Sequence, residues 1–576
     1  MKYIIKIRPK FSQTAVVGLT LLLLLAVACG AAATPQPQAT SPPTEAAAPT
    51  TAPVSAAPTA TPKPAATPAA VAPARLEQLT IALSAMGTEG VDPILSILDD
   101  KPYTRLMFNY LIDTDLADKE VSAGNSVAES WEWENDMKDL RVVLRKGMKY
   151  HDGSVLKAED VVFSLDRLHD PESRVPYADN IWGPQDAKTT TIEIVSDNEL
   201  VFHLDAPSIV FIPGLGPILG GSEGFVYSKS YFDEVGVEGF RKKPIGSGPY
   251  MLADSQVGLF RELEAFDDYF LGAPKIGKIK FIVVPEESTR IAMLKSGDAD
   301  LIEASRERSG SLAADGYNLF KKTGGDVITL MPHEWPSDTA GVFLDERVRK
   351  ALMTSINLEE INEFLLSGQG ILTGNWLVEG IGFGSKTIPP HPYDPDAAAQ
   401  LLRDSGYGEG DLEITLYVAK KTSFPEAEDV GQAILADWEK IGVKGSMVAQ
   451  DYGTLRPGIV DKSLDTPSMR IHGWSSRAMH SSILNLFFGC PQEKAWSICH
   501  DDAGQKIELL KEANTIEEYG DRQQAVAESL VDNHLASVLF VIGGVFASND
   551  KVTDWDMGAT AYELNFRYLA LKGLLD

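Results

Sequence analysis

The sequence predicts an α/β protein with more than one sheet. Short apolar or β-branched runs at Leu79–Leu83 and Lys278–Val284 are typical of strands. The second run is followed by a helix-like segment, Ser288–Ser296, and then by Asp300-Leu301-Ile302, an order that indicates a β-α-β unit. About 500 residues follow the N-terminal segment, and because single cores stop growing near ~250–300 residues, we expect at least two structural units.

The same alternation continues in the second half of the chain. Asp394-Pro395 predicts the N-cap and first residue of a helix that ends at Gly406, because a carboxylate accepts bonds from free amides and proline loses nothing at that position. Leu412–Val418 then alternates like a half-buried strand. Helix followed by strand is again the order of an α/β fold.

A second amphipathic helix is predicted at Pro425–Ile441. Its apolar residues recur every three or four positions, which places them on one face. These residues are Ala427, Val430, Ile434, Trp438 and Ile441. Gly442 should end the helix, and Val443–Val448 is the expected next strand.

The N-terminus has the layout of a secretory signal. Four basic residues precede an uncharged apolar run, Ala15–Ala28, that is shorter than the roughly 20 residues needed to span a bilayer. These basic residues are Lys2, Lys6, Arg8 and Lys10. Cys29 directly after the expected cleavage point resembles the lipobox of bacterial lipoproteins, although Ala26 stands where that motif usually has leucine. We therefore expect a lipoprotein signal at 1–28 and lipidation of Cys29.

A tether is predicted between the anchor and the folded part. Residues 31–74 are almost entirely Ala, Pro, Thr, Ser and Gln, a composition that cannot bury enough apolar surface to offset the entropy of ordering. The anchor cysteine and tether together span 29–75. No further apolar span is evident downstream, so we expect a module held at the cell membrane on its periplasmic or outer side.

Composition argues against several function classes. The formal net charge of −29 makes nucleic acid and anionic lipid surfaces poor partners. No HExxH zinc motif, phosphate-binding P-loop or EF-hand loop occurs in the sequence. We therefore predict no catalytic residue, metal site or cofactor.

The two remaining cysteines are nine residues apart. Cys490 and Cys499 lie in the part of the chain expected outside the cytoplasm, where disulfides persist. The spacing is compatible with a disulfide that closes a small loop.

Several separate sequence blocks resemble one family in the same order. The first three are Val127–Glu132, Leu144–Gly153 and Lys157–Ser164. Further blocks are Ile245–Tyr250, Asp268–Phe270, Lys295–Asp300, Asp345–Leu352 and Tyr393–Tyr407. Together they resemble the extracellular solute-binding proteins, family 5, which serve peptide, opine and nickel ABC importers. The resemblance runs from about Leu79 to the C-terminus.

This resemblance implies a periplasmic-binding-protein-like type II fold, with two lobes that close on a ligand about a hinge and an extra small domain. The expected ranges are 76–120 with 201–325 and 546–576 for lobe I, 121–200 for the small domain and 326–545 for lobe II. The implied function is that of a monomeric substrate-binding lipoprotein that hands a solute to an ABC permease. The alternative is an exported, lipid-anchored hydrolase or a receptor that signals without transport.

The ligand prediction turns on Arg477. In peptide-binding members, a glycine-tryptophan pair is followed by an aspartate that binds the α-ammonium of the peptide. Matching Gly473 and Trp474 to that pair places Arg477 at the aspartate position. An arginine presents a planar fork of donors suited to a carboxylate, so we expect an acidic ligand. Alternatively, Arg477 pairs with an internal acid or the register slips by a residue.

Aromatic residues supply the other pocket candidates. Leu98–Thr104 matches a loop that lies along the ligand in peptide-binding relatives, so Tyr103 is expected to face the cleft. Trp335, Trp376 and Trp474 could form flat apolar walls, although a single tryptophan is more often part of a core than of a pocket. For nickel, no histidine pair that would hold a metal complex is evident. We interpret His151 as a structural turn residue.

Overall fold

The computed structural model describes residues 75–96, 100–116, 121–173, 175, 189–217, 224–322, 325–335, 341–376, 387–420, 424–475, 481–558 and 564–572. All of them belong to one compact unit, Val71–Asp576. The predicted signal at 1–28, Cys29 and the tether up to residue 74 lie outside the described residues. Within the described part, no helix has the length and apolar character needed to cross a membrane.

The first sheet has seven strands in the order β12-β18-β11-β1-β10-β9-β8. Their bounds are β1 (Leu76–Leu83), β8 (Tyr250–Gln256), β9 (Phe260–Ala265), β10 (Ile276–Val283), β11 (Leu301–Ala304), β12 (Asn318–Lys321) and β18 (Val545–Ser548). β10 and β11 each run parallel to β1, and α6 (Glu287–Ser296) connects them. The predicted β-α-β unit is therefore confirmed.

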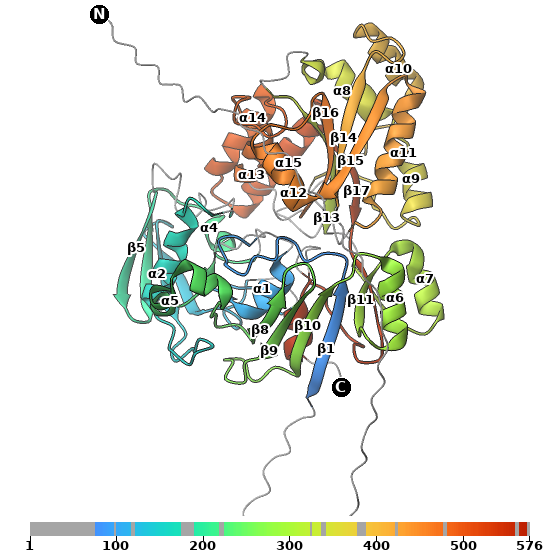
Figure 1. The fold of residues 1–576 in the computed structure, drawn as a ribbon. Coiled ribbons are helices and arrows are strands. Elements are labelled where there is room, and N and C mark those ends of the chain that lie inside the picture. The colour runs from blue at the N-terminus through green and yellow to red at the C-terminus, as the bar shows by residue number, and fades with distance from the viewer. Residues whose placement is uncertain are drawn as a thin grey trace, which may run out of the picture. The chain divides into compact units, whose positions relative to one another are not determined.

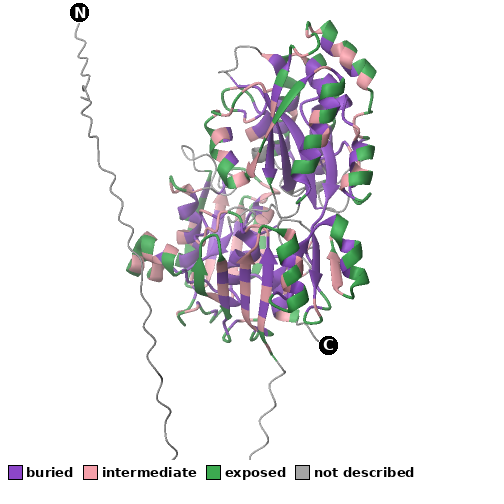
Figure 2. Cartoon of the chain, turned by 45° about the vertical axis from the view of Figure 1, so that its right-hand side comes forward, coloured by how far each residue is buried: buried purple, intermediate pink, exposed green. Residues whose placement is uncertain are grey.

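The second sheet has five strands in the order β15-β14-β16-β13-β17 (Figure 1). Their bounds are β13 (Asp326–His333), β14 (Glu413–Lys420), β15 (Lys444–Asp451), β16 (Ser468–Ser475) and β17 (Ser537–Ile542). One face shares a core with α8 (Glu346–Thr354), α9 (Leu358–Leu365), α10 (Pro395–Asp404) and α11 (Ala427–Lys440). The other face packs against α13 (Ser481–Phe488), α14 (Asp501–Leu509) and α15 (Ile516–Asp532). The inner strands of this sheet are buried, as Figure 2 shows, whereas the edge strand β15 is largely exposed.

Local signals place the helices of this second sheet where the sequence predicts them. Asp394 caps α10, because its Oδ1 accepts a bond from the Ala397 amide at 2.9 Å. Gly406 and Gly442 have φ angles of 91° and 83°, a left-handed conformation that favours glycine after a helix end. Both predicted helices and the two strands that follow them are thus confirmed.

A separate sheet has four antiparallel strands in the order β3-β4-β6-β5. They are β3 (Ala128–Glu134), β4 (Asp139–Leu144), β5 (Thr190–Ser196) and β6 (Glu199–Leu204). The predicted small-domain range, 121–200, ends inside β6, and β18 begins one residue before the predicted return to lobe I at 546. The strand ends follow hydrogen-bond ladders that composition does not reveal.

The remaining helices and strands pack around the three larger sheets. They are β2 (Asn109–Tyr110) paired with β7 (Phe225–Val226), α1 (Lys101–Met107), α2 (Ala158–Asp166), α4 (Phe211–Gly214), α5 (Lys229–Lys242), α7 (Arg306–Ala314), α12 (Tyr452–Val460), which packs against β14 of the second sheet, and α16 (Phe566–Lys572). The prediction of a loop at 98–104 is wrong from residue 101 onward, because the helix α1 begins there. Pro102 lies in the first turn, where its missing N–H costs nothing.

Candidate functional site

The segment expected to hold the ligand belongs to the central strand of the second sheet. β16 lies between β13 and β14, with Gly473 opposite Ile328 and Trp474 opposite Val327. Arg477, which carries the acidic-ligand prediction, lies outside the described residues. Its role therefore stays a prediction.

Trp474 packs against α13. It is 6% exposed, its ring centroid lies 4.6 Å from that of Phe487, and its indole N–H donates to Thr329 Oγ1 at 3.1 Å. His472 lies edge-on at 4.1 Å. The ring therefore joins β16 to the helical side of the second sheet.

The other two tryptophans are also buried beside this sheet. Trp335 stacks on His333 at 4.7 Å and its N–H donates to the Trp496 carbonyl at 3.4 Å. Trp376 meets Phe488 edge-on at 5.8 Å, and its N–H has no acceptor among the described residues. Of the three tryptophans, Trp376 is thus the one whose N–H finds no acceptor in the described part of the chain. Ligand contact by any of them stays a prediction.

Tyr103 is committed to internal contacts in α1. Its hydroxyl donates to the Asp100 carboxylate, and the Arg261 guanidinium lies 3.8 Å from the ring centroid. Burial, followed by the Asp100 charge, raises the pKa of Tyr103 well above its ordinary value. The described structure therefore holds this side chain inside the first lobe, and a contact with ligand stays a prediction.

Two segments of the chain pass side by side between the two sheets. The first leads from β12 to β13 and the second from β17 to β18. The Lys322 amide donates to the Gly544 carbonyl at 3.1 Å, and a Cβ on Gly543 would lie 2.1 Å from the Lys322 carbonyl oxygen. Only glycine permits this approach. Short paired connections of this kind are the usual hinge of a two-lobed protein.

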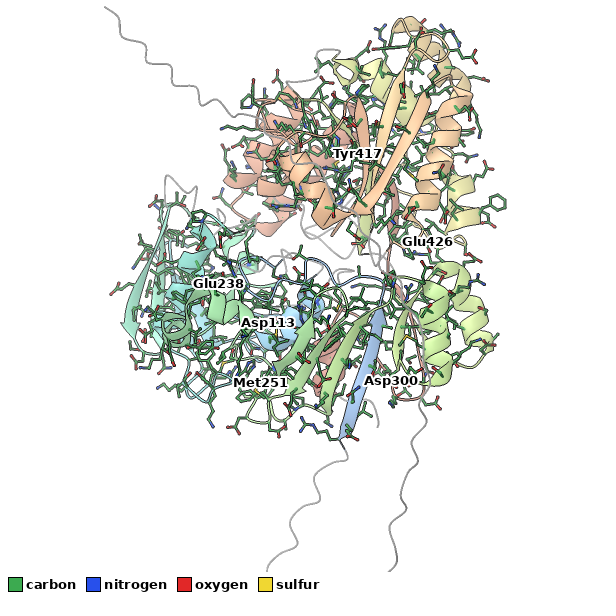
Figure 3. The ribbon with its side chains drawn as sticks, in the orientation of Figure 1. Asp113, Glu238, Met251, Asp300, Tyr417 and Glu426 are labelled. Carbon is green, nitrogen blue, oxygen red and sulfur yellow. A yellow bond between two sulfur atoms is a disulfide. The ribbon has the colours of Figure 1, made fainter. Side chains whose placement is uncertain are left out.

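A buried ion pair reinforces this crossing. Arg306, the first residue of α7, places Nη1 2.7 Å from Glu426 Oε2 and also donates to the Gly543 carbonyl. Glu426, labelled in Figure 3, immediately precedes α11. The pair therefore ties a helix of the first sheet to a helix of the second at the point where the chain crosses.

Glu303 is a buried carboxyl group at the carboxyl end of β11. It is 1% exposed; the Ser84 amide donates to its Oε2 at 2.8 Å, and Oε1 has no partner among the described residues. Burial raises its pKa to about 7, against the opposing effect of the nearby Arg290. Ligands of open α/β sheets bind beyond the carboxyl ends of parallel strands, and β1 and β11 are parallel there.

The arrangement of sheets and hinge agrees with a comparison against known families. The sequence model described as bacterial extracellular solute-binding proteins, family 5 Middle, matches residues 124–494. The chain belongs to this family. A family 5 protein is a solute-binding protein of an ABC transporter and works outside the cytoplasm.

Among the relatives of this family 5 protein is the dipeptide-binding protein of Escherichia coli, 26% identical over 458 residues, 71% of this chain and 81% of the relative. The periplasmic binding protein DppA of Helicobacter pylori, solved with the peptide STSA, superposes with a TM-score of 0.73 at 20% identity and covers 85% of this chain and 98% of its own. The binding protein AgaA of A. tumefaciens R10, solved with agropinic acid, gives 0.72 at 18% identity, with 85% and 97% covered. The predicted type II fold with two lobes is confirmed.

His151, in one of the family 5 blocks, braces the glycine-rich turn at Ile245–Tyr250. Its Nδ1 accepts from the Gly246 amide at 3.2 Å, so Nε2 carries the proton and donates to the Gly248 carbonyl at 3.0 Å. Burial lowers its pKa to about 4, which keeps the ring neutral. The interpretation as a structural turn residue is confirmed.

The structure joins Cys490 and Cys499 by a disulfide, with 9 residues of sequence separation. The bond closes the connection between α13 and α14. Asp501 lies close to both sulfurs, but disulfide sulfurs are not the thiolates that bind metals.

One short motif tests the hydrolase alternative. Gly220-Gly221-Ser222-Glu223-Gly224 has the GxSxG spacing of a nucleophile elbow, which requires a strand before the serine and a helix after it. Here α4 precedes the match and β7 follows it, which is the reverse order. Residues 220–223 lie outside the described part. The motif gives no support for hydrolysis.

The sequence analysis did not single out the buried charged residues, and three examples are Glu303, Arg306 and Arg470. Two of them carry a readable signal, because a single charge interrupts a run that is otherwise apolar. The runs are Leu301–Ala304 and Met469–Ile471. A charge in such a run is almost never fully buried without a specific reason.

Proposed function

We propose that this protein captures a small acidic solute, either peptide-like or an organic acid, outside the cell and delivers it to a membrane permease. The hinge at Lys322 and Gly544 supports capture by closure, since a ligand that contacts both lobes favours the closed state. Proteins of similar fold were solved with a peptide and with agropinic acid, and these two ligands illustrate the chemical classes of solute that we propose.

The charge of the ligand is argued from Arg477. The protein is strongly acidic overall, with a net charge of −29, so its long-range field repels anions. Capture of an acidic solute therefore needs a local, directed cation. An arginine provides two parallel N–H donors for a carboxylate and repels an ammonium group.

Native mass spectrometry of the purified protein should release an acidic small molecule. Arg477→Asp should then weaken its binding by at least about 30-fold, the lower end of the cost of losing one partner of a buried charge pair. Arg403→Asp, an equal change at an exposed position of α10, should leave affinity unchanged. Unchanged affinity of the Arg477 variant would remove that residue from the site. A co-purified peptide with a free amino terminus and no acidic side chain would keep capture but contradict the proposed acidic ligand.

We infer that Cys29 anchors the protein through a lipid. Metabolic labelling with a lipid analogue should mark the wild-type chain and should not mark Cys29→Ala. The reason is that the Cys29 thiol would be the group that receives the lipid. Equal labelling of both proteins would show that the chain is held by other means.

A further inference from the structure

Arg470 is a fully buried arginine that makes no hydrogen bond to any described residue. It lies in β16, with 0% of its surface exposed, and none of its three side-chain nitrogens has an acceptor within the described part of the chain. Among the described residues, the Phe487 ring of α13 lies close to it, with its centroid 5.4 Å from the guanidinium carbon. An arginine in this condition is unusual, because buried charges are normally paired.

The other buried arginines show how this fold ordinarily treats such a group. Arg290 donates to the carbonyls of Glu303, Val284 and Pro285 at 2.8–2.9 Å. Arg349 donates to four carbonyls. They are those of Phe343, Leu344, Asn533 and His534. Among the buried arginines that the structure describes, Arg470 alone lacks an acceptor on every nitrogen.

Among the described residues, those beside Arg470 in the sheet carry no acidic side chain. Tyr417 of β14 and Met331 of β13 are the register neighbours of Arg470 on its two sides. His333 is paired with Ser468, and both lie two residues along their strands from Met331 and Arg470, on the same face of the sheet. Tyr452 of α12 faces the group from the helical side. All of these side chains are neutral.

The charge itself persists in this environment. Burial lowers the pKa of Arg470 to about 10, which still leaves the guanidinium protonated at neutral pH. An isolated ion in a protein interior costs several kcal/mol unless an opposite charge or acceptors accompany it. An arginine does not escape this cost by losing a proton.

His333 adds a second available donor. Its Nδ1 lies 3.0 Å from Ser468 Oγ, and its Nε2 has no partner within the described residues. With the serine hydroxyl donating to Nδ1, Nε2 carries the proton. Burial, followed by the charge on Arg470, lowers the pKa of His333 well below its ordinary value, so the ring stays neutral.

We propose that Arg470 and His333 form an enclosed site for one small anion inside the second lobe. The site offers only donors, namely the guanidinium nitrogens and an imidazole N–H, and a halide or a carboxylate matches that set. The anion can be free chloride or a carboxylate of the transported solute. Binding of free chloride does not depend on Arg477 or on the identity of the ligand, whereas binding of the solute carboxylate rests on the proposed function.

The first test measures thermal stability of the full protein in sodium chloride and in the sodium salt of a bulky sulfonate, 2-morpholinoethanesulfonate, at equal ionic strength. Chloride at about 0.2 M should raise the wild-type Tm by about 2 °C. Arg470→Met should remove this difference, because it replaces the unpaired charge with an apolar chain of similar length. Arg403→Met, the same change at an exposed position, should retain it.

A second measurement needs no variant. Crystals of the wild-type protein grown in bromide should show anomalous density beside the Arg470 guanidinium, which identifies a free halide. If solute-loaded crystals instead show the solute carboxylate there, the anion comes from the ligand. Equal chloride stabilisation of wild type and Arg470→Met would overturn the proposal. Absence of anionic density at Arg470 in both crystals would also overturn it.

Discussion

Asp113→Ala is expected to lower the free energy of unfolding by about 3–5 kcal/mol, the cost of removing one partner from a buried ion pair. Asp113 is 1% exposed, and its carboxylate accepts from Arg105 Nη2 at 3.2 Å and from both terminal nitrogens of Arg567. Alanine would leave two buried guanidinium groups without this acid. Figure 3 labels Asp113 in the first lobe. Urea unfolding of the two proteins measures the difference.

A surface ion pair provides the matched control for this variant. Asp267 lies 2.7 Å from Arg75, and its side chain is 69% exposed. Asp267→Ala removes the same chemical group, but solvent screens that pair, so unfolding should change little. If both variants lost the same stability, burial of the Asp113 network would not be the reason for its effect.

Glu303→Gln is expected to change how stability depends on pH. The pKa of Glu303 rises from its ordinary value of 4.5 to about 7 on folding, because the carboxyl group is buried. The folded protein therefore binds more protons than the unfolded chain between these pH values. This contribution to stability is fully present below pH 4.5 and is lost as pH rises through about 7. The free energy of unfolding that is lost over this range is about 3 kcal/mol.

Glutamine stays neutral at every pH and does not suffer this loss. The difference in free energy of unfolding, Glu303→Gln minus wild type, should therefore increase by about 3 kcal/mol between pH 4.5 and pH 8. Histidines such as His151, whose pKa falls on folding, act in the opposite direction but are common to both proteins. Glu264→Gln, at an exposed position of β9, is the control. A pH-independent difference would contradict the buried carboxyl assignment.

Local elements of the fold were predictable because their signals lie within a few residues. The β10-α6-β11 unit is visible in the sequence as an apolar strand-like run, a helix-like segment and a second strand-like run. Asp394 and Gly442 mark helix ends through contacts with backbone groups three or four positions away. The first turn of α1 was missed because the expectation of a loop there came from family resemblance and not from the residues themselves.

The candidate site was predictable only in part. Gly473 and Trp474 do lie together in the central strand of the second sheet. The burial of Trp335, Trp376 and Trp474 was an open alternative, since a flat apolar ring suits both a core and a pocket wall. The role of Arg477 and the acidic nature of the ligand stay predictions, because both come from the family resemblance.

The sequence by itself determined the α/β class, the positions of the main helices and strands, and membership of a binding family, because repeating patterns and short motifs carry that information. Only the tertiary structure decided which buried charges meet. Asp113 and Arg567 are 454 positions apart, and Arg306 and Glu426 are 120 apart. No local pattern pairs such residues. They meet because strands distant in the chain lie together in the two sheets. Burial then leaves each charge only the partners within its reach, and the described residues offer Arg470 no hydrogen-bond acceptor.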